Sequence, residues 1–393
     1  MRPIDPSERI VTIDVLRGVA LFIVLVINTA TEFRVSIFEQ FLPAAAPAGP
    51  TDRVAADIVL ALHTKGFILF SFLFGVGLAI QFERLGQNPA RLVLLLRRLA
   101  VLLGIGLVHL FLISNGDILT EYAIVGFAVL PCVYGPRWVL AAASALSLGC
   151  YLAMPLLPPI ISLPDSAWIG PHLYAARRVY GGGSFMEILA FRVDEVANIA
   201  PLHVYAMPRT FGLFLLGVLA WRTGLFRRAP SGTSSLVVTA CVALAIGAWM
   251  TVAGANGEAF GWRLVWPLRA SFQALAQLVL AVGYGATIIV LAESAFGRTL
   301  LGWAGPIGRM AFTNYIVQSI ILSLVFYGFG FALFGRLTVG QSLMVAVVIY
   351  AAQAAFSAWW LARFRFGPVE WLWRSLMYGE LQPLTHVRAV ELR

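Results

Sequence analysis

The first apolar segment of the chain carries an acid and an arginine three residues apart. Asp14 and Arg17 precede a run from Val19 to Ile27 that contains no polar side chain. Residues at this spacing lie on one face of a helix, so the two side chains can pair. Arginine also binds phosphates through two hydrogen bonds at once. We therefore expect Arg17 to bind an anionic ligand and Asp14 to hold Arg17 in place.

A second arginine in the chain has a similar setting. Arg309 follows Gly308 much as Arg17 precedes Gly18, and a glycine allows close approach to the backbone. Asn314 follows in the next apolar segment. With the pair described above, these residues predict a site for the phosphates of an acyl coenzyme A, such as acetyl coenzyme A. The alternative for such arginines is topology determination and contact with lipid headgroups.

Histidines and acids gather at the opposite ends of the apolar segments. His63 lies with Lys65 inside a long apolar stretch, where ionisable residues are usually functional. Glu32 ends the first segment, and Asp117 lies in the block Asn115–Tyr122. A neutral imidazole oriented by a carboxylate can deprotonate a hydroxyl or an amine. We expect His63 to be this base, oriented by Asp117 or Glu32; the alternative is that each residue is an ordinary interfacial polar group.

The composition identifies the environment in which these residues work. The chain is 60% hydrophobic and 12% charged, about half the charged fraction of a soluble domain. A net charge of +9 is then better explained by arginines in cytoplasmic loops than by nucleic-acid binding. Three cysteines without tight spacing predict neither a disulfide framework nor a metal site.

The elements that position these residues are membrane-spanning helices. A bilayer core needs about 20 apolar residues per helix. The sequence predicts about ten spans in one all-α, polytopic helical bundle over residues 1–393, in the cell inner membrane. Arginine clusters place both termini in the cytoplasm. The spans are Ile13–Thr31, Ala56–Phe82, Leu92–Ile113, Ile118–Tyr134, Trp138–Leu157, Val204–Trp221, Leu236–Ala255, Ala270–Leu291, Ala311–Phe334 and Ser342–Leu361.

One sizeable extracytoplasmic loop is predicted over residues 158–201. Prolines are expected to break its first half. Ser184 and Glu187 have the spacing of a capping box, which predicts an amphipathic helix over Phe185–Ile199. This helix is either a passive connector or a lid over a site at the outer face.

Several blocks of sequence resemble the YeiB-type bacterial membrane family, known as domain of unknown function 418. That family is similar in turn to a superfamily of transmembrane acyltransferases, which includes heparan-alpha-glucosaminide N-acetyltransferases. The resemblance implies a cytoplasmic acyl coenzyme A donor and an acceptor at the far side of the membrane. The blocks are Ile13–Gly18, Phe70–Gly77, Gly116–Ala123, Gly308–Ser319 and Phe364–Arg374.

The chain departs from the superfamily at the position of the base. Asn28 stands about where the related sugar O-acetyltransferases carry a catalytic histidine. The resemblance therefore supplies no base, and His63 is the residue that we expect to act.

We predict an acyltransferase that moves an acyl group, such as acetyl, to a hydroxyl or amine of a small molecule or glycan. The alternatives are a small-solute transporter or exporter and a non-catalytic membrane scaffold, and homo-oligomerisation stays open.

Overall fold

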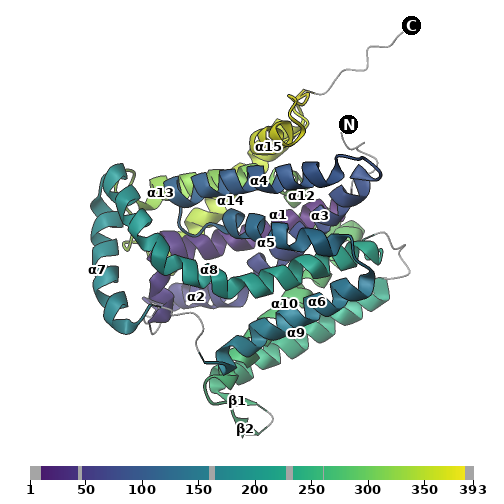
Figure 1. Cartoon of the computed structure of the whole chain (residues 1–393). Helices are drawn as coiled ribbons and strands as arrows, with labels where there is room; N and C mark the ends of the chain where they lie inside the picture. Colours follow the sequence, from purple (N-terminus) through teal and green to yellow (C-terminus); the bar gives the residue numbers. More distant parts are fainter. Residues whose placement is uncertain (1–9, 43–46, 159–163, 227–232, 260, 386–393) are drawn as a thin grey trace.

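The computed structural model describes residues 10–42, 47–158, 164–226, 233–259 and 261–385, and these are almost entirely helical (Figure 1). The strands form one antiparallel hairpin, β1 (Glu258–Ala259) and β2 (Trp262–Arg263). The α-helices are α1 (Val11–Asn28), α2 (Pro50–Leu62), α3 (Lys65–Leu85), α4 (Arg91–Leu112), α5 (Ile118–Val133), α6 (Arg137–Ala153), α7 (Ser166–Gly182), α8 (Phe185–Arg222), α9 (Thr233–Asn256), α10 (Leu268–Glu293), α11 (Ala295–Leu301), α12 (Ala304–Arg309), α13 (Ala311–Phe326), α14 (Val339–Leu361) and α15 (Pro368–Tyr378). Three short helical turns join them, Thr29–Phe33, Ile37–Phe41 and Met154–Leu156.

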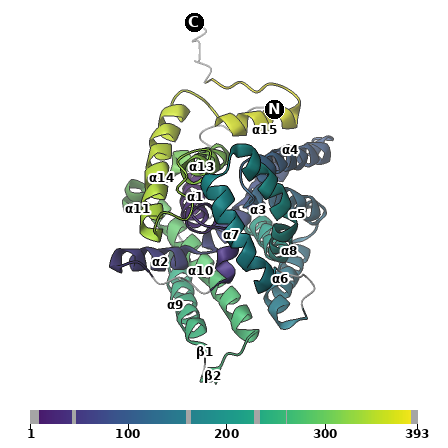
Figure 2. The same cartoon turned by 90° about the vertical axis from the view of Figure 1, so that its left-hand side faces the viewer.

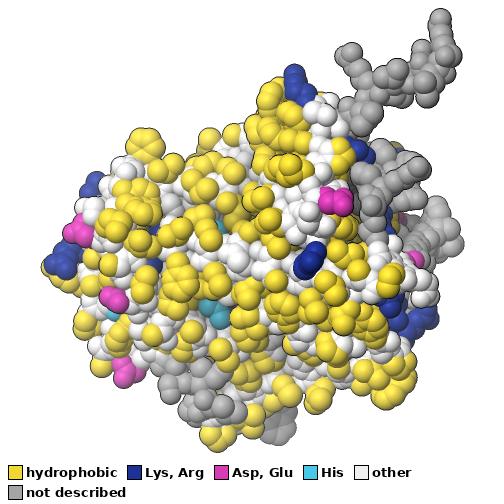
Figure 3. Space-filling view, turned by 45° about the horizontal axis from the view of Figure 1, so that its top comes forward, with side chains coloured by type: hydrophobic (Ala, Val, Ile, Leu, Met, Phe, Trp, Pro, Cys, Tyr) yellow, Lys and Arg dark blue, Asp and Glu magenta, His cyan; other side chains and the backbone are white. Residues whose placement is uncertain are grey.

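The fold is a polytopic helical bundle, as predicted. Within the described ranges, eight helical segments are long and apolar enough to cross a membrane, and α5 and α13 are shorter apolar helices. Hydrophobic side chains dominate the face drawn in Figure 3, and the few charged ones lie mostly toward its edges. We call the ends of α3, α4 and α8 that carry Arg84, Arg91 and Arg222 the arginine side, and the opposite side, with His63 and His203, the histidine side.

Helix α1 forms the centre of the bundle. Most of its residues are buried, and it packs against α3, α10, α12, α13 and α14 (Figure 2). At its histidine side it continues into the π-helical turn Thr29–Phe33. The hydroxyls of Thr29 and Thr31 donate hydrogen bonds to the carbonyls of Leu25 and Ile27, which extends the helical path. Such turns are frequent at functional sites, and this one carries Glu32.

The second predicted span is broken, whereas the sequence predicted one segment from Ala56 to Phe82. Helix α2 ends at Leu62, and α3 begins at Lys65. Thr64, between them, has a φ of 66°, a left-handed conformation that non-glycine residues rarely adopt. The chain therefore changes direction inside an apolar stretch, which hydrophobicity alone does not reveal.

The loop predicted over residues 158–201 differs from expectation in two ways. Its first half contains α7, and Pro171 lies inside that helix. The capping box of Ser184 and Glu187 is confirmed, but the helix that it opens runs unbroken to Arg222. Figure 1 shows α7 standing across the direction of α8 at one edge of the molecule. Residues 159–163 of this loop lie outside the described residues.

Helix α7 is tied to α8 through a buried carboxylate. Glu195 on α8 accepts a hydrogen bond from Tyr180 and lies 2.7 Å from Nε2 of His172, both on α7. Asn115, just before α5, donates to the same carboxylate at 2.8 Å. Buried polar groups that are bonded in this way fix one arrangement of their elements. The α7 helix, α8 and the Asn115 loop are therefore held together at the histidine side.

Helices α3 and α8 touch through two glycines, which gives a test of the packing. A Cβ on Gly75 would lie 2.1 Å from the Phe214 carbonyl oxygen, and one on Gly217 would lie 2.1 Å from that of Phe72. We expect Gly75→Val to reduce the free energy of unfolding by about 1–3 kcal/mol, because overpacking forces the helices apart. The control is Gly149→Val on α6, where a Cβ meets nothing within 4 Å. Equal thermal midpoints for the two variants in detergent would contradict this packing.

Candidate functional site

A cavity of about 570 Å³ lies inside the bundle and is lined by α1, α3, α4, α5, α8, α12, α13 and α15. We call it the arginine cavity. Its charged lining comprises Arg17, Arg84, Arg98, Arg309 and Arg374, with Asp14 and Glu370 as the acids. Its size falls in the range of small-molecule pockets, roughly 300–1,000 Å³. Positive charge therefore exceeds negative charge in its lining, which favours an anionic ligand.

The structure brings together three of the four residues that we expected to bind the donor. Asp14 Oδ1 lies 3.5 Å from Arg17 Nη1, so the predicted pair forms. Arg309 lines the same cavity from the end of α12. Asn314 is instead absent from the described lining. Its side-chain amide donates to the Ile307 carbonyl at 3.3 Å and to Ser357 Oγ at 3.0 Å. Asn314 therefore joins α12, α13 and α14.

The glycines beside the two arginines pack helices together. A Cβ on Gly18 would lie 2.1 Å from the Ala304 carbonyl oxygen, and one on Gly308 would lie 1.8 Å from that of Asp14. Their absent side chains allow α1 and α12 to touch. This contact places Arg17 and Arg309 on the wall of one cavity.

Arg98 is a cavity residue that the sequence did not distinguish from Arg97. Its guanidinium carbon lies 4.5 Å from the centre of the Trp373 ring on α15, and Trp373 Nε1 donates to the Arg98 carbonyl at 2.9 Å. Arg97, one residue earlier, is exposed. Both residues have apolar neighbours three and four positions away, so the sequence pattern does not show which of the two is buried. The packing of α15 decides it.

Helix α15 is anchored over the arginine side of this cavity by Glu370. The Glu370 carboxylate accepts hydrogen bonds from the backbone amides of Phe312 and Thr313 at 2.8 and 3.1 Å, and it thereby caps the start of α13. Burial raises the pKa of the Glu370 carboxyl, while these hydrogen bonds oppose the rise. The anchor positions Trp373 and Arg374 on the cavity wall.

Two tyrosines line the cavity where it reaches the start of α5. Tyr122 shares a hydrogen bond of 2.9 Å with Ser71 on α3, and Tyr315 on α13 donates to the Gly116 carbonyl at 3.4 Å. The Tyr315 ring also lies 5.1 Å, centre to centre, from the ring of His109 on α4. The cavity therefore extends from the arginines to tyrosines that touch a buried histidine.

His109 is paired with Asp117, the acid that we expected to orient His63. His109 Nδ1 lies 2.9 Å from Asp117 Oδ1, although the ring is turned away from the ideal hydrogen-bond direction, and both side chains are buried. Asp117 also caps α5, accepting from the amides of Leu119 and Thr120 at 3.1 and 2.7 Å. His109 Nε2 is buried with no hydrogen-bond partner among the described residues. The Asp117 carboxylate is therefore close enough to stabilise a protonated His109 ring, although neither ring nitrogen makes a hydrogen bond of standard geometry with a described residue.

Glu32 lies against the same loop and not beside His63, which we expected it to orient. A Cβ on Gly116 would lie 1.9 Å from Glu32 Oε2, so only glycine leaves room for the carboxylate. This oxygen is buried, and no described residue bonds to it. The π-helical turn of α1 and the loop before α5 thus bring Glu32 beside Asp117.

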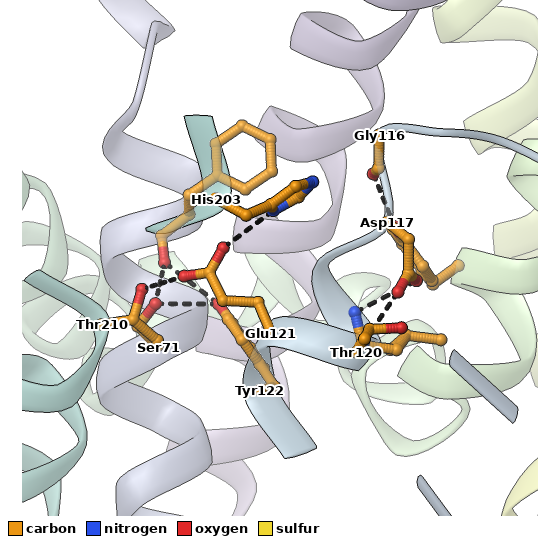
Figure 4. A network of polar contacts seen from close by, with 11 residues as sticks. Ser71, Gly116, Asp117, Thr120, Glu121, Tyr122, His203 and Thr210 are labelled. Carbon is orange, nitrogen blue, oxygen red and sulfur yellow. Dashed lines mark hydrogen bonds and ion pairs between the residues drawn. The ribbon is translucent and has the colours of Figure 1, made fainter. Parts of the chain in front are cut away.

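A second histidine–carboxylate pair lies one turn further along α5 (Figure 4). His203 Nδ1 on α8 lies 3.1 Å from Glu121 Oε2, and the Thr210 hydroxyl donates to Glu121 Oε1 at 2.5 Å. The His203 side chain is 24% exposed, whereas that of His109 is 1% exposed. Figure 4 shows the His203–Glu121 pair and Asp117 near each other in one view. His203 is therefore the more accessible of the two.

His63 lies apart from the acids that we expected to orient it. It ends α2 at the helix break, and its Nδ1 lies 3.2 Å from the Thr64 hydroxyl. The neighbouring Lys65 is fully buried, and its amine donates to the Leu60 carbonyl at 3.4 Å. His63 is also not among the described residues that line the arginine cavity. His63 and Asp117 therefore lie at two different places in the structure, and Asp117 does not orient His63.

The described residues include no group of three or more histidine, cysteine or acidic side chains placed to hold a metal ion.

The apolar spans and buried ionisable residues define a multi-pass helical membrane protein with an internal cavity lined by arginines. The model of a family described as "Protein of unknown function (DUF418)" matches residues 220–380. The chain is 32% identical to "Uncharacterized protein YxaH" of Bacillus subtilis (strain 168), over 98% of both chains. It is 30% identical to "Uncharacterized protein YeiB" of Escherichia coli (strain K12), over 94% of this chain and 96% of the relative. The chain belongs to the DUF418 family, which confirms the resemblance to YeiB-type proteins.

Proposed function

We propose that this protein is a membrane-bound acyltransferase that uses an acyl coenzyme A donor. The observation that carries the proposal is the single cavity that joins five arginines to Tyr122 and Tyr315 beside the His109–Asp117 pair. Arginine side chains suit the donor's phosphates, and the apolar wall between the two ends suits its uncharged arm. The arginine side then faces the cytoplasm of a cell whose inner membrane holds the protein, following the positive-inside rule.

In the proposed step, His109 acts as the general base. Its Nε2 takes a proton from the acceptor hydroxyl or amine, and Asp117, whose Oδ1 lies 2.9 Å from Nδ1, stabilises the positive charge that the ring gains. The acceptor oxygen or nitrogen forms a bond to the acyl carbon, and the bond from that carbon to sulfur breaks. The departing thiolate takes the proton from His109. General base catalysis of this kind contributes roughly 10²–10⁴-fold to rate.

The acceptor is proposed to approach from the histidine side. His203 is partly exposed there, and it contacts Glu121, which accepts a hydrogen bond from Thr210. These groups can hydrogen-bond a hydroxyl or amine of a small molecule or glycan. Donor and acceptor would then meet from opposite faces at the start of α5.

The proposal is tested with purified protein in nanodiscs and radiolabelled acetyl coenzyme A. We expect saturable donor binding and slow release of acetate and free thiol, with water as the acceptor. An absence of both binding and thiol release, in protein that remains folded, would overturn the proposal.

A second candidate function is transport or export of a small solute, which the break between α2 and α3 favours. Discontinuous helices with buried charges line the substrate sites of many transporters, and Lys65 is a buried charge at such a break. Solute accumulation in proteoliposomes without any thiol release from acetyl coenzyme A would support this function over acyl transfer.

A further inference from the structure

A second cavity on the arginine side is separate from the proposed donor site. It also has a volume of about 570 Å³ and lies between the ends of α3, α5 and α8, the start of α4 and the turn before α6. We call it the second arginine pocket, defined by Arg91, Arg137 and Arg222 with Glu83 and Trp221. Trp221 also lines the arginine cavity, so the two cavities share one wall.

The three guanidinium groups of this pocket are held in place. Arg91 lies 4.1 Å above the centre of the Phe82 ring and donates to the Gly86 carbonyl at 2.7 Å. Arg137 donates to the Arg222 carbonyl at 2.8 Å, and Arg222 donates to the Gly135 carbonyl at 2.6 Å. A guanidinium has five N–H donors, and these bonds use one apiece. The groups are therefore positioned by the fold with donor capacity remaining.

The balance of charge in the pocket favours an anion. Among the described residues, three arginines and one acid line the pocket, and Oε2 of that acid, Glu83, accepts a hydrogen bond from Trp221 Nε1 at 2.6 Å. Tyr134 and Trp138, which flank the turn before α6, are 45% and 71% exposed. Exposed aromatic residues at the ends of spans mark the membrane–water interface. The pocket thus lies at the depth of lipid headgroups.

We infer that the second arginine pocket binds a phosphate group at the membrane surface, that of an anionic phospholipid or of a soluble phosphate. Basic pockets between spanning helices on the cytoplasmic side bind anionic headgroups, and arginine matches phosphate geometry through paired hydrogen bonds. The inference does not rest on the proposed acyl transfer, because it concerns a different cavity and different arginines.

The test compares Arg137→Gln and Arg222→Gln with a control, Arg97→Gln, which removes an exposed arginine on the same side of the protein. Delipidated protein is titrated separately with phosphatidylglycerol in detergent and with inorganic phosphate, and the shift of the thermal midpoint is measured against each protein's own ligand-free value. Native mass spectrometry counts the retained phosphatidylglycerol. We expect at least about tenfold weaker binding for each pocket variant, equivalent to one lost charge-assisted interaction, and no change for Arg97→Gln.

The two ligands distinguish the source of the phosphate. A response to phosphatidylglycerol alone assigns the pocket to lipid, and a response to inorganic phosphate assigns it to a soluble ligand. Arg137→Lys and Arg222→Lys keep the charge, and we expect them to bind more tightly than the glutamine variants. Equal binding by wild type, the pocket variants and Arg97→Gln would overturn the inference, as would an absence of response to both ligands.

Discussion

Replacing His109 by glutamine should reduce the release of free thiol from acetyl coenzyme A by at least about 100-fold, the lower range for loss of a general base. Donor affinity should change by less than about twofold, because His109 is not among the described residues lining the arginine cavity. The measurement pairs thiol release with equilibrium binding of the labelled donor in nanodiscs. The change is tolerated sterically, since glutamine is no larger than histidine.

The matched comparison for this prediction is His63→Gln. The sequence predicts His63 as the base, whereas in the structure Asp117 lies beside His109. Loss of turnover in His63→Gln with normal turnover in His109→Gln would place the base at the α2–α3 break. Normal turnover in both variants would show that neither histidine is the base.

Replacing Arg17 or Arg309 by glutamine should raise the Kd for acetyl coenzyme A by about tenfold or more, and the double replacement should raise it further. A hydrogen bond to a charged group contributes about 1.5–3 kcal/mol, and about 1.4 kcal/mol corresponds to a factor of ten. Arg17 and Arg309 share one cavity wall, so both should contact the same phosphates. Equilibrium binding of the labelled donor measures the effect.

The control for the arginine prediction is Arg97→Gln, which makes the same change of charge at an exposed position outside the described cavity lining. Its Kd should stay within about twofold of wild type. An equal loss of affinity in all three single variants would show that net charge, and not a defined site, attracts the donor.

The pairing of Asp14 with Arg17 was predictable because both residues lie within one helical turn. Their spacing alone fixes which face they share, and the structure confirms the contact. The polytopic bundle was equally predictable, since the length of an apolar stretch decides whether it can cross a bilayer. These are local properties, which a sequence records directly.

The pairing of acids with histidines was not predictable, because it depends on how helices meet. Asp117 lies eight positions beyond His109, across a loop whose path hydrophobicity does not determine. The same holds for Arg98, which differs from Arg97 only through contact with Trp373 on α15. The one local signal that was available is Gly116, whose missing side chain admits the Glu32 carboxylate.

Helix α8 has a mechanical consequence that follows from its length. Its 38 residues extend about 57 Å at 1.5 Å per residue, nearly twice the roughly 30 Å of a bilayer core. Glu195 fastens it to α7 at one end, and Trp221 forms the wall between two cavities at the other. Pro201 and Pro208 each remove one backbone hydrogen bond inside this helix, so a tilt at one membrane face reaches the opposite face through a helix that can bend at these prolines. Pulsed dipolar spectroscopy with spin labels on α7 and at the end of α8 would measure the distance between these two sites and show whether they move together.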